Sequence, residues 1–262
     1  MAEIVRDGGR LSFDVHGAGN RPTLVLLSSL GTTTELWTDQ VQLANAYRLV
    51  CLDTRGHGHS DTPPGPYTLE QLGRDVIAVL DDLGCTRAHV CGISLGGMVA
   101  LWLAIHTPHR VNRIIAANTG ARVGSTELWA QRITDVHTRG LPALASDSVT
   151  RWFTEQFRMT HPAVVEQYRH MLGCGSATGY VGCCAALRDA DLGDDLHRIV
   201  APTLVITGTA DVATPPAVGE LVSLRVPDAR LLSLEAAHLS NVEQPDRFTS
   251  GVRDFLQSAT YG

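Results

Sequence analysis

The chain has 262 residues, 44% of them hydrophobic, which is enough for one large core or for a core with a smaller cap. Its 21 lysines and arginines and 27 aspartates and glutamates give a formal net charge of −6, and no basic block is present. This charge argues against nucleic acid as a partner. No stretch approaches the roughly 18 apolar residues that a membrane span needs, and the first residues lack the apolar segment of a signal peptide. We therefore expect no membrane partner.

The six cysteines do not predict a metal or disulfide site. Cys51 and Cys91 lie in apolar, strand-like runs, where a thiol behaves as a small hydrophobic group. None of the cysteines shows the paired Cys/His spacing of a zinc site. The adjacent pair Cys183 and Cys184 suggests redox chemistry, but the interpretation we prefer is that they are two small residues of a cap helix. We expect a reduced, cytoplasmic protein without a bound metal.

Taken in chain order, the first elements are short strands at residues 3–7 and 11–16, which flank a Gly-Gly turn and predict a hairpin. Compact apolar runs then predict strands buried on both faces at residues 23–27, 48–52, 88–92, 111–117, 203–207 and 230–234. Apolar residues at helical spacing predict helices at residues 69–83, 95–106, 215–224 and 242–256. This alternation predicts an α/β fold in which a mostly parallel central sheet carries helices on both faces.

Residues 121–199 break the alternation. The stretch contains Trp129, Trp152 and several other aromatic residues but no buried-strand run. Its pieces predict helices at residues 125–139, 141–146, 148–157, 163–172 and 177–188. We interpret it as a helical cap over the carboxyl edge of the sheet, inserted into a core domain formed by residues 1–120 and 200–262.

The central motif is Gly-Ile-Ser-Leu-Gly at residues 92–96, with Ser94 at its centre. It follows a predicted strand and begins a predicted helix, the context of a nucleophile elbow. The sharp turn requires small neighbours, and Gly92, Gly96 and Gly97 satisfy that requirement. The amino end of the helix also directs its dipole at a developing oxyanion. The pattern predicts Ser94 as a nucleophile.

A serine hydroxyl needs a base within hydrogen-bond reach. His238 follows the last predicted strand, where the chain returns to the edge from which Ser94 emerges. His57 and His59 are alternatives, although histidines flanked by glycines suit a structural turn or the pocket rim. The base needs an acid, and Asp211 follows the penultimate strand in the order Ser, Asp, His that is typical of this motif.

Asp189 and Asp191 are alternative acids, but both precede the penultimate strand. An oxyanion hole needs two backbone donors. We expect one from Leu95, directly after the nucleophile. The other should come from the Ser-Ser-Leu-Gly loop at residues 28–31, where Leu30 is the preferred donor and its neighbours remain alternatives.

These residues resemble those of the α/β-hydrolases and, among them, of the 3-oxoadipate enol-lactonases of aromatic-compound catabolism. The elbow and the Asp-Thr-Arg-Gly-His-Gly turn at residues 53–58 are superfamily-wide. The Ser-Ser-Leu-Gly loop is more telling, because most relatives carry a His-Gly pair there. The stretches Gly-Tyr-Val-Gly-Cys-Cys-Ala-Ala at 179–186 and Ala-His-Leu-Ser-Asn-Val-Glu-Gln-Pro at 237–245 are the most specific to the family. Ser29 departs from it where some members carry Asn, without affecting the backbone role of the loop.

The resemblance implies an α/β-hydrolase fold and hydrolysis of 3-oxoadipate enol-lactone to 3-oxoadipate, in the β-ketoadipate pathway, without a cofactor. The expected partner is thus a small lactone that carries a carboxylate; self-association stays open. Because the protein is net negative, a local cation must bind the carboxylate, and the planar guanidinium of arginine can bind both of its oxygens. Arg132 is the first candidate, since it lies at i+3 from Trp129 and shares its helix face; Arg151 and Arg158 are alternatives. Trp129 and Trp152 either line the pocket or belong to the core of the cap.

Two other functions remain open. A carboxylesterase or a carbon–carbon bond hydrolase would use the same fold and the same triad, because fold does not determine substrate. The second is a non-enzymatic ligand receptor with a hydrolase fold. The complete set of Ser94, Asp211 and His238 favours an enzyme.

Overall fold

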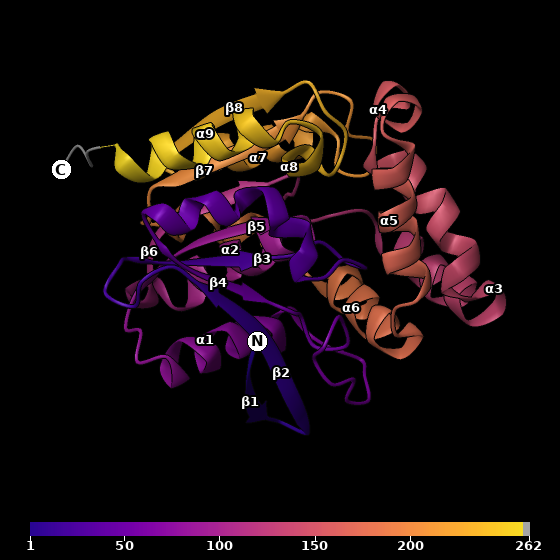
Figure 1. The fold of residues 1–262 in the computed structure, drawn as a ribbon, viewed down its shortest axis with the longest axis horizontal. Coiled ribbons are helices and arrows are strands. Elements are labelled where there is room, and N and C mark those ends of the chain that lie inside the picture. The colour runs from indigo at the N-terminus through magenta and orange to yellow at the C-terminus, as the bar shows by residue number, and fades with distance from the viewer. Residues whose placement is uncertain (259–262) are drawn as a thin grey trace.

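A computed structural model describes residues 1–258 of the chain and contains one eight-stranded sheet (Figure 1). The strand order is β1-β2-β4-β3-β5-β6-β7-β8. β1 pairs with β2 and β2 with β4 in antiparallel fashion, and all other neighbours are parallel, as the sequence predicted. The strands are β1 (Ala2–Arg6), β2 (Gly9–His16), β3 (Thr23–Leu27), β4 (Arg48–Leu52), β5 (Ala88–Ile93), β6 (Val111–Ala117), β7 (Thr203–Gly208) and β8 (Ala229–Leu234).

Helices cover both faces of the sheet, and this explains why the central strands are largely apolar. Every residue of β3 and β7 is buried. α1 packs on α2, whereas η1 packs with α8 and α9. These elements and their neighbours are η1 (Thr34–Asn45), α1 (Leu69–Asp82), α2 (Leu95–His106), η2 (Pro108–Arg110), η3 (Gly193–Arg198), α7 (Pro216–Arg225), α8 (Ser240–Glu243) and α9 (Pro245–Gln257). The sequence analysis did not anticipate η1.

Between β6 and β7 the chain forms four α-helices, followed by η3, and no strand. They are α3 (Thr126–Trp152), α4 (Glu155–Thr160), α5 (Pro162–Gly173) and α6 (Ala177–Asp189), called here the α3–α6 segment. α3 packs against α5 and α6, and α4 packs against α5. Figure 1 shows this group standing together beside the sheet, on the right of the view. Among residues 1–258, no helix is both long and apolar enough to cross a membrane.

Three of the predicted helices, at 141–146, 148–157 and 242–256, are wrong in their boundaries. α3 continues through the expected break after residue 146 and ends at Trp152, so the expected helix 148–157 does not exist as one unit. The chain is extended at Phe153 before α4 begins. The expected helix 242–256 is divided into α8 and α9 at Gln244. Proline at position 245 explains this division, because proline disfavours helical geometry in the residue before it.

Candidate active site

Ser94 occupies the sharp turn between β5 and α2. Its backbone has φ 56° and ψ −115°, a strained conformation for a residue with a side chain. A Cβ atom at Gly92 would collide with the backbone of Gly96, and one at Gly96 would collide with the carbonyl of Leu27 on the neighbouring strand. The Ser94 amide donates to Ala117 O at 3.0 Å. The glycines therefore allow the close approach that fixes Ser94 at the carboxyl end of the sheet.

His238 and Asp211 are joined at the ends of β8 and β7. His238 Nδ1 lies 2.9 Å from Asp211 Oδ2, and both side chains are buried. Asp211 Oδ1 accepts hydrogen bonds from the amides of Ala213 and Thr214, at 2.8 and 2.9 Å. Burial opposes ionisation of Asp211, but the adjacent His238 and the hydrogen bonds of Thr214 outweigh it, so the pKa of Asp211 is lowered. The ionised carboxylate can hold a proton on Nδ1 and leave Nε2 free to act as a base.

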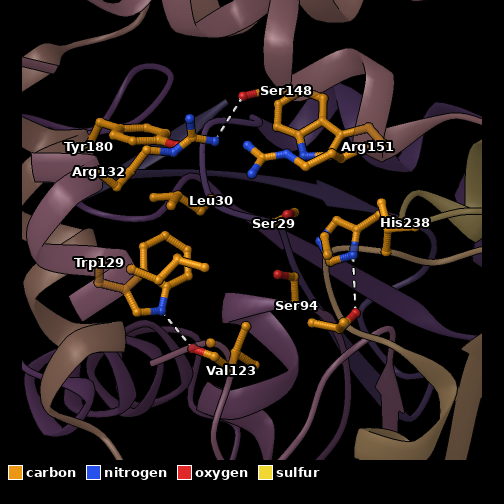
Figure 2. A pocket seen from close by; sticks show the side chains of 16 residues that line it. Ser29, Leu30, Ser94, Val123, Trp129, Arg132, Ser148, Arg151, Tyr180 and His238 are labelled. Carbon is orange, nitrogen blue, oxygen red and sulfur yellow. Dashed lines mark hydrogen bonds between the residues drawn. The ribbon is translucent and has the colours of Figure 1, made fainter. Parts of the chain in front are cut away.

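Ser94 and His238 line the same pocket (Figure 2). Within the described residues, no hydrogen bond joins the two side chains in this structure. Such contacts are commonly longer in a ligand-free hydrolase and shorten when substrate binds. Ser94 is 5% exposed, so a reacting group must enter the pocket to reach it.

The loop after β3 presents a backbone amide to the pocket. Leu30 lines the pocket, and within residues 1–258 neither its amide nor that of Leu95 has a hydrogen-bond acceptor. The neighbouring amides are occupied: Gly31 N donates to His57 Nε2 at 3.0 Å, and Thr32 N donates to the Ser29 carbonyl at 3.1 Å. The occupied Gly31 amide distinguishes Leu30 from its next neighbour as an oxyanion donor.

The alternative bases lie outside the pocket. His57 is buried, and burial lowers its pKa, so the ring is neutral near pH 7 and accepts the Gly31 amide while Nδ1 donates to Arg55 O. His59 is largely exposed beside Asp53. His57 therefore holds the loop that carries Leu30.

The alternative acids also lie elsewhere. Asp189 pairs with Arg188 at 2.7 Å, and Asp191 pairs with Arg122 at 3.2 Å. Both carboxylates are largely exposed, and neither lines the pocket with Ser94.

Two arginines of α3 line the pocket. Arg132 donates to Ser148 Oγ at 3.1 Å, and Figure 2 shows its guanidinium group pointing toward that of Arg151. Burial and the charge of Arg132 lower the pKa of Arg151. Neither arginine forms an ion pair with an acidic residue among residues 1–258. Two adjacent cations without a counter-ion favour an anionic ligand.

The third candidate, Arg158, and two further arginines of the α3–α6 segment, Arg169 and Arg188, do not line this pocket. Arg169 and Arg188 form ion pairs with Glu166 and Asp189. Arg158 lies in α4, and its Nε is buried without a hydrogen-bond partner among the described residues.

Aromatic side chains complete the wall. Trp129 and Trp152 both line the pocket, and Trp129 Nε1 donates to Val123 O at 2.6 Å (Figure 2). Tyr180, which the sequence analysis placed only within the cap, lines it as well. Burial raises the pKa of the Tyr180 hydroxyl, so the side chain is neutral.

Sequence reasoning missed Asn118, which directly follows β6. Its side-chain amide donates to Asp211 Oδ2 at 3.0 Å and to Ala237 O at 3.1 Å. Its φ is 44°, which is uncommon for a residue with a side chain. A polar residue at the carboxyl end of a buried strand was the signal that could have identified it. No cluster of three His, Cys, Asp or Glu residues suited to a metal ion occurs within residues 1–258.

Comparison with known proteins agrees with this architecture. The profile of the alpha/beta hydrolase fold family matches residues 22–245. The chain is 45% identical to 3-oxoadipate enol-lactonase 2 of Acinetobacter baylyi over 94% of this chain and 93% of that one, and 38% identical to 3-oxoadipate enol-lactonase 1 of the same organism over 97% and 95%. The crystal structure of the enol-lactonase from Burkholderia xenovorans superimposes with a TM-score of 0.96 at 40% identity, covering 98% of this chain and 100% of that one. The chain therefore belongs to the α/β-hydrolase family.

Proposed function

We propose that this protein hydrolyses the lactone ring of 3-oxoadipate enol-lactone to 3-oxoadipate. The observation that carries the proposal is a pocket in which Ser94 and His238 face two arginines that have no acidic partner among the described residues. The names and the extensive similarity of the enol-lactonase relatives support the choice of substrate. An acidic lactone offers both an acyl carbon for a serine and an anion for the arginines.

In the proposed mechanism, Ser94 Oγ attacks the ring carbonyl while His238 Nε2 takes its proton. Asp211 keeps the other ring proton on Nδ1 and stabilises the imidazolium. The amides of Leu30 and Leu95 bind the oxygen that becomes negative. Collapse of the intermediate breaks the ring C–O bond and releases an enolate, which His238 protonates and which then becomes a ketone.

Water completes the reaction. His238 accepts a proton from water, which attacks the acyl-enzyme, and Ser94 leaves as the restored hydroxyl. The product then carries one more carboxylate than the substrate. All steps use groups that line the pocket or contact its members directly.

We assign the substrate carboxylate to Arg132, with Arg151 as its neighbour. Both lie on α3, and the α3–α6 segment would act as the cap over Ser94, inserted between core residues 1–120 and 200–262. Trp129 and Trp152 would form the apolar walls around the ring. The six cysteines are free, which supports the proposed cytoplasmic location.

An assay of the purified protein with the enol-lactone, beside neutral aryl esters and ring-fission ketones, tests the substrate. We expect kcat/KM to be highest for the enol-lactone. A higher value for an ester would favour the second candidate, a carboxylesterase. The exposed apolar residues Leu128 and Val212 at this pocket are the observation that favours it. Binding without turnover of any of these compounds would favour a receptor.

A further inference from the structure

Glu243, five residues after His238 and at the end of α8, joins two segments that are distant in the sequence. Its Oε1 accepts from Ala237 N and from Thr154 N, each at 3.0 Å. Its Oε2 accepts from Thr154 Oγ1 at 2.8 Å. One carboxylate thus binds the residue before His238 and Thr154, which lies between α3 and α4.

A second link runs beside the first. Leu239 N, directly after His238, donates to Trp152 O at 3.0 Å. Ala237, before His238, is therefore linked to Thr154 through Glu243, and Leu239, after His238, is bound directly to Trp152. That junction directly follows Arg151 and includes Trp152, both of which line the pocket.

The opposite side of the same loop is bound to the sheet. Asn118 Nδ2 donates to Ala237 O at 3.1 Å, and Asn118 Oδ1 accepts from Ser240 Oγ at 2.6 Å. His238 thus lies in a short loop that is held by Asn118 on one side and by Glu243 and Trp152 on the other. A displacement of the α3–α4 junction must also displace this loop, because hydrogen-bond distances vary only within a narrow range.

We propose that Glu243 is a positioning residue that holds His238 and the pocket wall at Arg151 and Trp152 in one fixed relation. The inference rests on the proposed function insofar as His238 is the base. Glu243 does not line the pocket; it acts through the backbone of the His238 loop and through Thr154. Substrate contact with the end of α3 is thereby coupled to the placement of the base.

The test compares Glu243→Ala and Glu243→Gln with Glu235→Ala. Glu235 is an exposed glutamate of the same loop, and its side chain makes no hydrogen bond among residues 1–258, so its replacement is the matched control. We expect Glu243→Ala to lower kcat roughly 10- to 100-fold, because small displacements of a catalytic group are costly. Glu243→Gln keeps one oxygen for the two amides and should lose less. The control should match the wild type.

Two readouts separate positioning from mere stability. The proton between His238 Nδ1 and Asp211 gives a downfield NMR signal, which should shift or broaden in Glu243→Ala although the variant remains folded. Turnover of 4-nitrophenyl acetate should fall together with turnover of the enol-lactone. The NMR readout needs no substrate. If the wild type does not turn over the enol-lactone, the proposed function is refuted, but the positioning role of Glu243 is still tested by the NMR signal.

An unchanged His238 signal together with unchanged kcat, even with a lower Tm, would overturn the proposal. If Glu243→Ala does not fold, Thr154→Val provides a second test, because it removes the bond to Glu243 Oε2 and leaves the bonds of Glu243 Oε1 to the amides of residues 154 and 237. It also removes the hydroxyl that accepts from Phe157 N at the start of α4. Thr154→Ser keeps the hydroxyl and is its control. Equal kcat in these two Thr154 variants would likewise contradict the role of Glu243.

Discussion

The two sides of the pocket are built in different ways. On the sheet side, α2 is buried from Leu95 to Ile105, and Asp211 receives hydrogen bonds from several buried groups. On the other side, Val136 is the one buried residue in the first half of α3, among residues 126–140. Within residues 1–258, the side chain of Arg132 forms one hydrogen bond there, to Ser148 Oγ. Reaction chemistry needs groups fixed by packing, whereas a loosely packed segment adapts to substrate.

The largest effect should follow from removing the nucleophile on the sheet side. Ser94→Ala should reduce kcat/KM by roughly 10³-fold or more for every substrate, leaving the contribution of binding and of the oxyanion hole. Steady-state kinetics with the enol-lactone and an aryl ester measure this loss. Ser29→Ala is the control, because Ser29 lines the same pocket. Near-normal turnover by the Ser94 variant would refute the mechanism.

On the α3 side, the effect should depend on substrate charge. Arg132→Ala should cost about 2–5 kcal/mol in transition-state binding of the enol-lactone, since a buried charge contact is lost. A neutral aryl ester should lose much less. The comparison of kcat/KM for the two substrates measures the difference, and Arg169→Ala, at an exposed ion pair, is the control. Equal losses on both substrates would mean that Arg132 is structural.

A smaller effect is expected at the kink of α3. Gly140 has φ 75° and ψ 163°, a conformation that residues with side chains avoid. Gly140→Ala should lower the free energy of unfolding by about 1–3 kcal/mol. Denaturant unfolding measures this, and KM for the enol-lactone should change more than kcat. Gly19→Ala is the control, because a Cβ atom there meets open space. Similar losses of unfolding free energy in both variants would show that the conformation at Gly140 does not determine the effect.

The smallest effect should be on the pH dependence of the unfolding free energy, through His57, which holds the loop that carries Leu30. Burial lowers the pKa of His57 below its ordinary value of 6.5, so the unfolded chain binds a proton more readily than the folded one. This contribution to stability is complete above pH 6.5 and is lost as the pH falls from there toward the folded pKa. His57→Gln should therefore reduce the slope of unfolding free energy against pH below 6.5. Part of the slope should remain in this variant, because burial also lowers the pKa of His89, to about 4.

Urea unfolding at several pH values between 7.5 and 5 measures the slope. His59→Gln is the matched control, because His59 lies in the same loop with a largely exposed side chain. A slope that is identical in the wild type and in His57→Gln would show that His57 is not the buried neutral group described above.

Local sequence determined the sheet and the turn at Ser94. Residues 23–27, 48–52 and 111–117 are strands with the bounds that their apolar runs predict. An uninterrupted apolar run is a signal contained within a few neighbouring residues, and so is the glycine pattern around Ser94. The α/β fold and the family resemblance followed from such local signals.

Tertiary structure decided which cap side chains reach the pocket. Helical spacing placed Trp129 and Arg132 on one face but could not say which face is turned toward Ser94, because that depends on how α3 packs against α5 and α6. The same holds for Arg151, which lines the pocket, and for Arg158, which does not. Glu243 and Thr154 are 89 positions apart, and only the folded chain brings them within 3.0 Å. Sequence spacing carries no information on such contacts, since they form when separate elements pack together.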